Sequence, residues 1–600
     1  MINRKRLSKR VLKNIIYVSC CIAWSFIFSF CSDPNAMEQY GISDAMDEVI
    51  TRIYSERREE DINKSTQKEI LEYLTKDEKN TFGSAYWVFK VSEESDVYVC
   101  RDQNQKEAPY WLERNGFVKT PYQVKNEFIT YEVWHKRFDK GLVNLGVNGF
   151  DRHRFVYFTL VKPVNTGKNI KIAPVFPEKQ NVLQLNEGVF TYHDWDELVV
   201  TEFSKELAGA QLLSTIRGRS REAHLIGAFR KTDYPSSKQV DQVLQTWTDD
   251  PSSSITIGWR TDVNTKKSTL KYWEVNKLDT MAVEAESEVF EDRQLANDRF
   301  IRRFTAVLQD LNKGKVYEYF IETPEGRTEI YSFTTAAEEE DFEFGWYGDV
   351  HIDSLWGQNL RKKDKEFEDI KFYLFSGDLV NTGLYRNEWD ELFHLMGQVF
   401  YHKPFMATPG NHDSQEGLPP TRYLENLRYP DNGPETMEKG LTYYFSYGNT
   451  KFLMLDGVTY SVEEQKEWLE EVLKDSDETF KIAVFHFPPY TPNEDYDDII
   501  EHWVPLFEQY GVDMVLNGHF HYYLRNKAKN ASLTEKNTPT YVMSVGTTYK
   551  NEDGPTPSDP KIHYYKSHLF QRFSVSETKL EMTAYDDEGN VIDHYIIDKK

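Results

Sequence analysis

Five short clusters of Asp, Asn and His occur in the C-terminal part of the chain. In order, they contain Asp349 and His351; Asp378; Asn411, His412 and Asp413; His486; and His519 and His521. Carboxylate and imidazole groups are the ligands that hard or borderline di- and trivalent metal ions prefer. Two such ions about 3.5–4 Å apart can hold a hydroxide and clamp a phosphoryl group for in-line attack, which takes about seven ligands with one carboxylate shared.

Each cluster taken alone is a weak signal. An Asp and a His two residues apart recur by chance, a Gly-Asp after a strand is typical of a helix-start loop, and Gly-Asn-His-Asp is typical of a turn. Here, however, all five clusters follow apolar runs, and a glycine directly precedes four of them: Gly348, Gly377, Gly410 and Gly518. Repeated placement of this kind favours one shared site over five structural coincidences.

The elements that would position these residues alternate between strands and helices. Strand-like apolar runs at residues 342–347, 371–376, 405–408, 452–455, 482–485 and 513–517 each end near a cluster or a further Asp. Helical spacing fills several intervals, including Trp389–Val399 and Val462–Leu473. This alternation predicts an α/β layered domain over residues 340–600, with the polar residues at the carboxyl ends of its strands.

The five clusters resemble the five sequence blocks of the calcineurin-like metallophosphoesterase superfamily. The resemblance implies a four-layer αββα fold and two metal ions, of manganese, iron or zinc. One ion would be held by Asp349, His351, Asp378 and His521. The second would be held by Asp378, Asn411, His486 and His519, with Asp378 bridging. By the same resemblance, His412 would bind the phosphate or protonate the leaving oxygen, and Asp413 would orient its imidazole.

A narrower resemblance is to purple acid phosphatases, in which a fibronectin type III-like domain precedes this catalytic domain. The chain departs from their pattern at two positions. Purple enzymes carry Gly where His351 stands, and a Tyr ligand where Asn381 stands. Without a tyrosinate ligand, a strongly ferric first site is not implied, and manganese, reduced iron and zinc all suit the donor set.

The residues before the α/β domain are predicted to form three further segments. Residues 38–84 have helical spacing, and residues 85–245 form a β-rich accessory domain with one possible helix near residues 204–214. Residues 250–336 are predicted to form the fibronectin type III-like sandwich. Leu311, Gly314 and Tyr317 there have the spacing of a tyrosine corner, in which the hydroxyl bonds back to the backbone.

The N-terminus is predicted to be an export signal at residues 1–31. A basic stretch precedes an apolar run from Ile15 to Phe30, which is short for a membrane span and ends at Cys31. The pattern is similar to a bacterial lipoprotein signal, in which Cys31 would be lipidated; an uncleaved anchor and ordinary cleavage are the alternatives. All three place the bulk of the chain outside the cytoplasm.

The charge of the chain restricts its partners. The formal net charge is −25, so nucleic acids and anionic surfaces are disfavoured, and a phosphate-bearing substrate needs a local positive charge such as bound metal ions. The predicted function is therefore hydrolysis of small phosphate esters, with monoesters favoured over diesters. The alternative is a catalytically silent surface binding protein with a relic phosphoesterase domain, although a relic is expected to have lost at least one ligand.

Several other residues had two possible interpretations. Arg386 could contact substrate phosphate, but a solvated arginine at a helix start is the favoured interpretation. Trp346, Tyr347 and Trp356 could line the site or pack in the core. His153 and His193 have no second ligand nearby at metal spacing and are predicted to be loop histidines.

Overall fold

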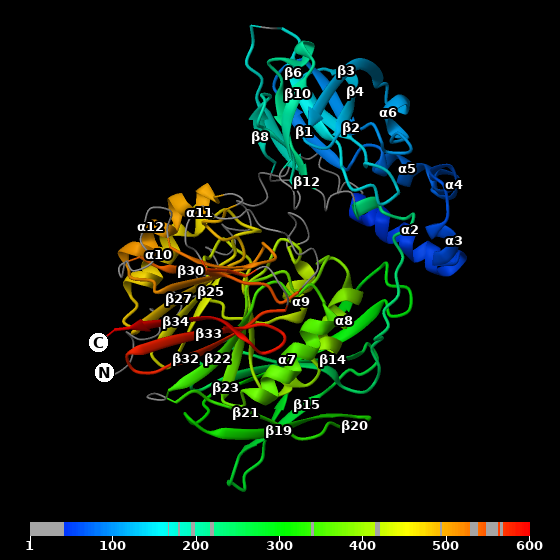
Figure 1. Cartoon of the computed structure of the whole chain (residues 1–600). Helices are drawn as coiled ribbons and strands as arrows, with labels where there is room; N and C mark the ends of the chain where they lie inside the picture. The colour runs from blue at the N-terminus through cyan, green and yellow to red at the C-terminus, as the bar shows by residue number, and fades with distance from the viewer. Residues whose placement is uncertain are drawn as a thin grey trace, which may run out of the picture.

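The computed structural model describes residues 41–599 except for several internal stretches (Figure 1). These stretches are residues 166, 178–179, 194–197, 217–220, 338–340, 415–419, 493–494, 528–537, 548–561 and 565–567. The predicted signal and anchor at residues 1–31 lie outside the described residues, as does the side chain of His193. Within the described part, no helix is long and apolar enough to cross a membrane.

The N-terminal unit begins with four short helices that pack against a β-sheet. They are α2 (Ile42–Glu56), α3 (Glu59–Asn63), α4 (Gln67–Tyr73) and α5 (Lys76–Phe82). Thr66 and Thr75 cap α4 and α5 through capping boxes, which satisfy amide groups at the helix starts. The apolar stripe of α2, which includes Val49 and Ile53, belongs to the same buried cluster as Phe89 and Val99 of the strands. The predicted helical and β-rich segments therefore share one hydrophobic core.

The strands of this unit form a nine-stranded sheet and a three-stranded sheet. The larger has the order β12-β9-β10-β3-β4-β2-β6-β11-β8, and the smaller the order β5-β1-β7. The bounds are β1 (Trp87–Val91), β2 (Ser95–Asp102), β3 (Val118–Asn126), β4 (Thr130–Phe138), β5 (Gly141–Leu145), β6 (Phe158–Pro163), β7 (Ile172–Phe176), β8 (Val182–Gln184), β9 (Phe190–His193), β10 (Leu198–Phe203), β11 (Gln211–Leu213) and β12 (Thr215–Ile216). The prediction of a possible helix near residues 204–214 is wrong. This stretch contains one 3-10 turn, Lys205–Leu207, followed by strand β11.

The next domain is a two-sheet β-sandwich. One sheet has the order β13-β14-β18-β17, and the other contains β16, β15, β19, β20 and β21. The bounds are β13 (Asp241–Thr246), β14 (Ile255–Asp262), β15 (Thr269–Glu274), β16 (Met281–Glu284), β17 (Glu286–Glu291), β18 (Phe300–Leu308), β19 (Val316–Thr323), β20 (Gly326–Arg327) and β21 (Tyr331–Thr334). The Tyr317 hydroxyl accepts a hydrogen bond from the backbone N–H of Asn312 at 2.9 Å, so the predicted tyrosine corner is present. Because β13 pairs with β14, this domain starts about ten residues before the predicted boundary at residue 250.

The C-terminal domain contains two packed sheets, as predicted. The first has the order β24-β23-β22-β32-β33-β34 and the second β25-β26-β27-β28-β30-β29-β31. The bounds are β22 (Phe342–Tyr347), β23 (Ile370–Phe375), β24 (Phe405–Ala407), β25 (Tyr443–Tyr447), β26 (Thr450–Met454), β27 (Phe480–Val484), β28 (Met514–Asn517), β29 (Tyr523–Asn526), β30 (Thr540–Met543), β31 (Ile562–Tyr564), β32 (Phe570–Val575), β33 (Lys579–Tyr585) and β34 (Val591–Asp598). Strands β22, β23 and β24 run parallel, as do β26, β27, β28 and β30.

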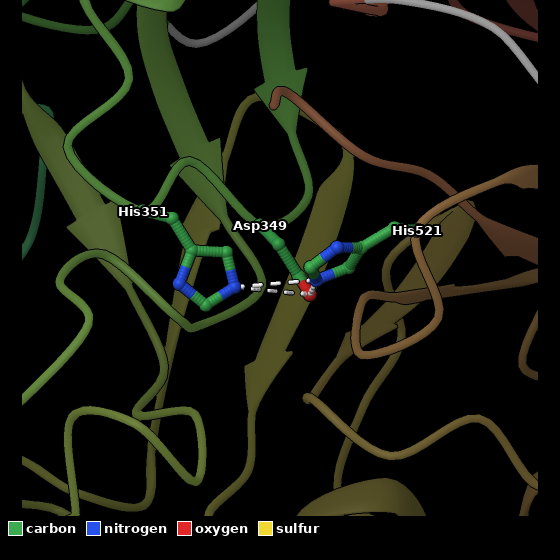
Figure 2. A group of neighbouring side chains, drawn as sticks. All are labelled: Asp349, His351 and His521. Carbon is green, nitrogen blue, oxygen red and sulfur yellow. Dashed lines mark hydrogen bonds and ion pairs between the residues drawn. The ribbon is translucent and has the colours of Figure 1, made fainter. Parts of the chain in front are cut away.

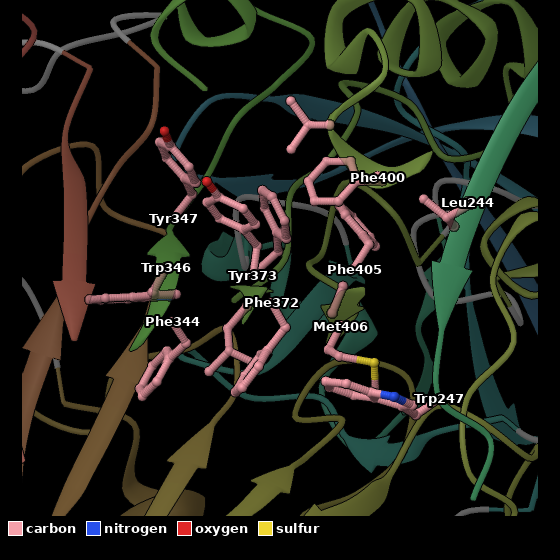
Figure 3. Close-up of a cluster of buried hydrophobic side chains, with 14 of the residues drawn as sticks. Leu244, Trp247, Phe344, Trp346, Tyr347, Phe372, Tyr373, Phe400, Phe405 and Met406 are labelled. Atoms are coloured by element: carbon pink, nitrogen blue, oxygen red, sulfur yellow. The ribbon is translucent and has the colours of Figure 1, made fainter. Parts of the chain in front are cut away.

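Helices cover the outer faces of both sheets, which gives the four layers (Figure 1). On the first sheet lie α7 (Ser354–Glu366) and α8 (Arg386–Met396); on the second lie α10 (Lys466–Lys474), α11 (Asp497–His502) and α12 (Val504–Gln509). Between the sheets, Phe344 and Phe372 (Figure 3) stack with ring centroids 5.4 Å apart. Both rings also make edge-to-face contacts with Phe452. The fold class is thus confirmed: β-rich N-terminal parts followed by an α/β domain.

The β-sandwich and the α/β domain are joined by shared core packing and buried ion pairs. Trp247, just after β13, packs 5.3 Å from the ring of Phe372 (Figure 3). Arg386, at the start of α8, pairs with Asp298 at 2.9 Å, and both side chains are buried. Arg260 of β14 pairs with Asp390 of α8 at 2.6 Å. The two ion pairs hold α8 against the β-sandwich. They also hold the loop that connects Asp378 to the start of α8.

Candidate metal centre

The seven predicted ligands all lie at the carboxyl ends of the central parallel strands. Asp349 and His351 follow β22, Asp378 follows β23, and Asn411 follows β24. His486 follows β27, and the pair His519 and His521 follows β28. Because parallel strands end at the same edge of a sheet, residues far apart in sequence converge at one place.

The first group consists of Asp349, His351 and His521 (Figure 2). Nε2 of His521 lies 3.3 Å from a carboxylate oxygen of Asp349, and Nε2 of His351 lies 3.9 Å from it. The two Nε2 atoms lie 3.2 Å from each other. Two imidazole nitrogens and a carboxylate oxygen facing one another at these distances form a set of donors suited to one cation.

The second group consists of Asp378, Asn411, His486 and His519. Nε2 of His486 lies 2.8 Å from Oδ1 of Asn411 and 3.3 Å from Asp378, while Nδ1 of His519 lies 3.2 Å from Oδ1 of Asn411. Asp378 also lies 3.6 Å from Nε2 of His351 in the first group. It is therefore the carboxylate placed between the two groups, where a shared ligand would stand.

The backbone around the candidate ligands is strained. His351, Asp378 and His519 have φ angles of 46°, 51° and 80°, in the left-handed region that non-glycine residues rarely adopt. Among the described residues, seven non-glycine positions have a positive φ, and these three are candidate ligands. Strain of this kind persists where the surrounding structure fixes it, and it concentrates at functional sites.

Two of the predicted glycines are required by close approach. A Cβ atom at Gly410 would lie 2.1 Å from Oδ1 of Asp378, and one at Gly518 would lie 2.1 Å from Oδ1 of Asp349. Any side chain at these positions would displace a candidate ligand.

The electrostatics of the site favour cation binding. Burial, with the neighbouring His412, lowers the pKa of His351 to about 3, and burial lowers the pKa of His519 well below its ordinary value. Both imidazoles are thus neutral at pH 7, which is the form that binds metal. Burial opposes a charge on His486, but Asp378 and Asp349 raise its pKa to about 9. Positive charge is therefore stabilised beside these carboxylates, and the donor set fits a pair of metal ions.

The imidazole and the backbone N–H of His412 each make a contact close to Asp378. Nδ1 of His412 lies 2.7 Å from the carbonyl oxygen of Asn381, and its backbone N–H donates to Oδ1 of Asp378 at 2.8 Å. The carboxylate of Asp413 instead accepts from three backbone amides, those of Leu379, Val380 and Gly410. That Asp413 orients the imidazole of His412 stays a prediction. Asp413 fixes the loops that carry Asp378 and Asn411.

The remaining sequence-predicted residues take part in ion pairs, core packing or contacts within the N-terminal unit. Arg386 is buried in its ion pair with Asp298, so both interpretations of it, substrate contact and solvated arginine, are wrong. Trp346, Tyr347 and Trp356 are all fully buried, so they pack in the core. His153 bonds to Asp102 at 3.0 Å within the N-terminal unit.

Two partly buried carboxylates support neighbouring loops and helix starts. Glu388, in the first turn of α8, accepts hydrogen bonds from the amides of Asn381 at 2.9 Å and Thr382 at 2.7 Å. Asp353 caps α7 and accepts from His568 at 2.9 Å. Their one sequence signal is an acidic residue at a predicted helix start, and this is too common to identify a supporting role.

Comparison with known families assigns two domains in this chain. Residues 342–523 match the family model of calcineurin-like phosphoesterases. Residues 240–335 match the purple acid phosphatase N-terminal domain, which agrees with a domain start at β13. The chain therefore contains a calcineurin-like phosphoesterase domain directly after a purple acid phosphatase N-terminal domain.

Three relatives are similar to parts of this chain. An uncharacterized protein of Mycobacterium tuberculosis is 30% identical over 196 residues, which cover 28% of this chain and 37% of the relative. Probable purple acid phosphatase 20 of Arabidopsis thaliana is 27% identical over 254 residues, covering 39% of this chain and 58% of the relative. Acid phosphatase type 7 of Danio rerio is 23% identical over 425 residues, covering 61% of this chain and 93% of the relative. The chain thus spans little more than a third of the mycobacterial protein.

The fold is similar to that of a solved purple acid phosphatase from yellow lupin (Lupinus luteus) seeds. The TM-score is 0.53 at 13% sequence identity, with 85% of this chain and 93% of the lupin chain covered. At this identity the likeness concerns the arrangement of the domains and sheets.

Proposed function

We propose that this chain is a dinuclear metal-dependent phosphoesterase that hydrolyses small phosphate esters, with monoesters preferred. One observation carries the proposal: seven donors from five strand ends of the two sheets meet at one place, and Asp378 lies between two groups of them. No candidate ligand of the predicted set is missing. This completeness argues against a relic domain that only binds.

The residues divide into two sets of ligands. Asp349, His351, Asp378 and His521 would hold one ion, and Asp378, Asn411, His486 and His519 would hold the other. When bound, the pair of ions supplies Lewis acidity, neutralises phosphate charge and lowers the pKa of coordinated water towards neutrality. Asp413 and Glu388 keep the loops that bear these ligands in place through their bonds to backbone amides.

His412 is proposed as the general acid. A carbonyl oxygen can only accept a hydrogen bond, so Nδ1 of His412, facing Asn381, carries a proton. Nε2 can give a proton to the leaving oxygen of the ester only in the imidazolium form, which carries a proton on both nitrogens. Because burial lowers the pKa of His412, this form is populated at acid pH. Its ring lies beside that of His351, with centroids 4.7 Å apart, and so at the edge of the first group of donors.

The preference for small monoesters is supported by charge and by the relatives. A net charge of −25 repels long nucleic acids, which would contact much of the protein surface. A small ester would contact only the metal centre, where the bound cations would offset the negative charge. The Arabidopsis and zebrafish relatives are named as acid phosphatases.

The test is hydrolysis of an aryl monoester and a bis-aryl diester by the purified chain with manganese added. We expect faster turnover of the monoester, and we expect Asp378→Asn to abolish it without altering the circular dichroism spectrum. Asp431→Asn removes an exposed carboxylate of the same domain and serves as the matched control. Retained activity in Asp378→Asn would exclude the proposed site.

We also propose that the enzyme acts outside the cytoplasm, tethered through a lipid on Cys31. The support is the basic stretch and the apolar run that precede Cys31 in the sequence. Expression in a bacterium with labelled fatty acid should label the chain, and Cys31→Ser should prevent labelling. Equal labelling of both would contradict the lipid anchor.

A further inference from the structure

Three aromatic side chains surround His519. The ring centroid of Phe487 lies 4.7 Å from that of His519 with the planes at 89°, and Phe520 lies 4.8 Å away at 67°. Tyr496 lies 6.0 Å from His519 and stacks on Phe487 at 4.9 Å with an angle of 11°. The four rings thus form one continuous aromatic group around a candidate metal ligand.

The origin of these rings places them at the metal centre. Phe487 directly follows His486 after β27, and Phe520 stands between His519 and His521 after β28. Tyr496 directly precedes α11. Phe487 and Phe520 therefore lie at the strand ends that carry the second group of donors, and Tyr496 joins them through its stacking on Phe487.

The three rings border the hydrophobic core but are more exposed than the aromatic residues inside it. Phe487, Tyr496 and Phe520 are all partly exposed, and so is His519 itself. The aromatic residues that only pack, such as Phe344 and Trp346, are fully buried. Apolar ring surface beside a partly exposed ligand is available to a molecule bound at that ligand.

We infer that Phe487, Tyr496 and Phe520 form a subsite for a planar aromatic group on the alcohol side of the phosphate ester. The inference rests on the proposed function, because the metal centre must hold the phosphate. Aromatic rings pair with other rings by offset stacking or by edge-to-face contact, and these geometries favour a planar group over a saturated ring of similar size. Because the rings lie about one ring's width from His519, the aromatic group should be attached to the ester oxygen directly or through one carbon.

Competitive inhibition by phosphonates tests this subsite without a leaving-group effect, since phosphonates are not hydrolysed. The pair is benzylphosphonate and cyclohexylmethylphosphonate, assayed against an alkyl phosphate substrate of the manganese-loaded enzyme. We expect the benzyl compound to bind at least about tenfold more tightly. Phe520→Leu and Tyr496→Leu, each made separately, should reduce this ratio severalfold while inhibition by inorganic phosphate stays the same.

Phe128→Leu is the control, because Phe128 is an exposed phenylalanine of the N-terminal unit and its loss should not change the ratio. A benzyl-to-cyclohexyl ratio near one in the unmodified enzyme, or a ratio unchanged in both variants, would overturn the inference and leave the phosphoesterase proposal standing. A protein that neither hydrolyses the substrate nor binds inorganic phosphate would contradict both the aromatic subsite and the proposed phosphoesterase function.

Discussion

The carbonyl oxygen of Asn381 lies 2.7 Å from Nδ1 of His412 and fixes the tautomer of that imidazole. Asn381 stands three residues after Asp378, where purple acid phosphatases carry a tyrosine ligand. In this chain the backbone carbonyl of Asn381 contacts the candidate general acid His412. The backbone amide of Asn381 in turn donates a hydrogen bond to Glu388, which lies on helix α8.

His412→Ala should lower kcat by about 10²–10⁴-fold for alkyl phosphates, the usual contribution of a general acid. The loss should be much smaller for nitrophenyl phosphate, because its leaving oxygen needs no proton. Measuring kcat across esters with leaving groups of different pKa checks this. An equal loss on all of them would show that His412 positions the substrate instead of protonating it.

Glu388→Ala should lower kcat more than it changes KM, because it releases the amides of Asn381 and Thr382 and loosens the partner of His412. Glu388→Gln keeps an acceptor oxygen for these amides and should recover most of the activity. Steady-state kinetics of both variants measure the split. If Gln is as damaging as Ala, the carboxylate matters for its charge and not for its hydrogen bonds.

Glu388 should also give the fold a pH dependence. Burial raises its pKa from 4.5 to about 7, although Arg230 and the two amides oppose the rise. The folded state therefore binds this proton more tightly than the unfolded state, so the contribution to stability is largest at low pH. It declines by about 3 kcal/mol as pH rises from about 4.5 to about 7. The free energy of unfolding of the wild type should fall relative to that of Glu388→Gln over this range, and parallel curves would contradict the shift.

Asp390→Ala should destabilise the chain by about 3 kcal/mol. Asp390 lies between two buried guanidinium groups, 2.6 Å from Arg260 and 3.7 Å from Arg386, and removing one partner leaves buried charge uncompensated. Urea unfolding measures the change. The exposed pair Arg58–Asp61 is the control, and Asp61→Ala should cost less than about 1 kcal/mol. Similar costs at both sites would contradict the role of burial.

Tyr385 should couple the N-terminal unit to the catalytic loop. Arg152 donates to its hydroxyl at 2.6 Å, and Arg230 lies 4.0 Å from its ring. Tyr385→Leu should speed hydrogen exchange of residues 381–385 by about tenfold, since both contacts are lost. Tyr385→Phe keeps the ring and should have a smaller effect. Unchanged exchange in Tyr385→Leu would show that the two parts do not depend on each other here.

The sequence was sufficient to predict the α/β layers and the convergence of seven side chains, since both follow from apolar strands that end in polar clusters. That these side chains bind metal stays a prediction. The contacts that hold these side chains in place could not be predicted from local sequence patterns. Arg386 looks like a solvated helix-start residue until Asp298, from another domain, is brought beside it. The partner of His412 is a backbone carbonyl, which no side-chain motif can reveal.

The shared core of the N-terminal helices and strands could not be predicted for a similar reason. A change of period from helical to strand-like near residue 85 suggested separate segments. Only the packing of Val49 and Ile53 against the strands shows that both belong to one core.

Metal content per chain tests the central claim most directly. Elemental analysis of the purified protein, loaded with manganese, iron or zinc and then freed of excess ion, should give two ions per chain. Asp378→Asn should retain fewer than one, because Asp378 lies between both groups of donors. A wild-type protein that binds no ion or one ion, or an Asp378→Asn variant that still holds two, would contradict the account.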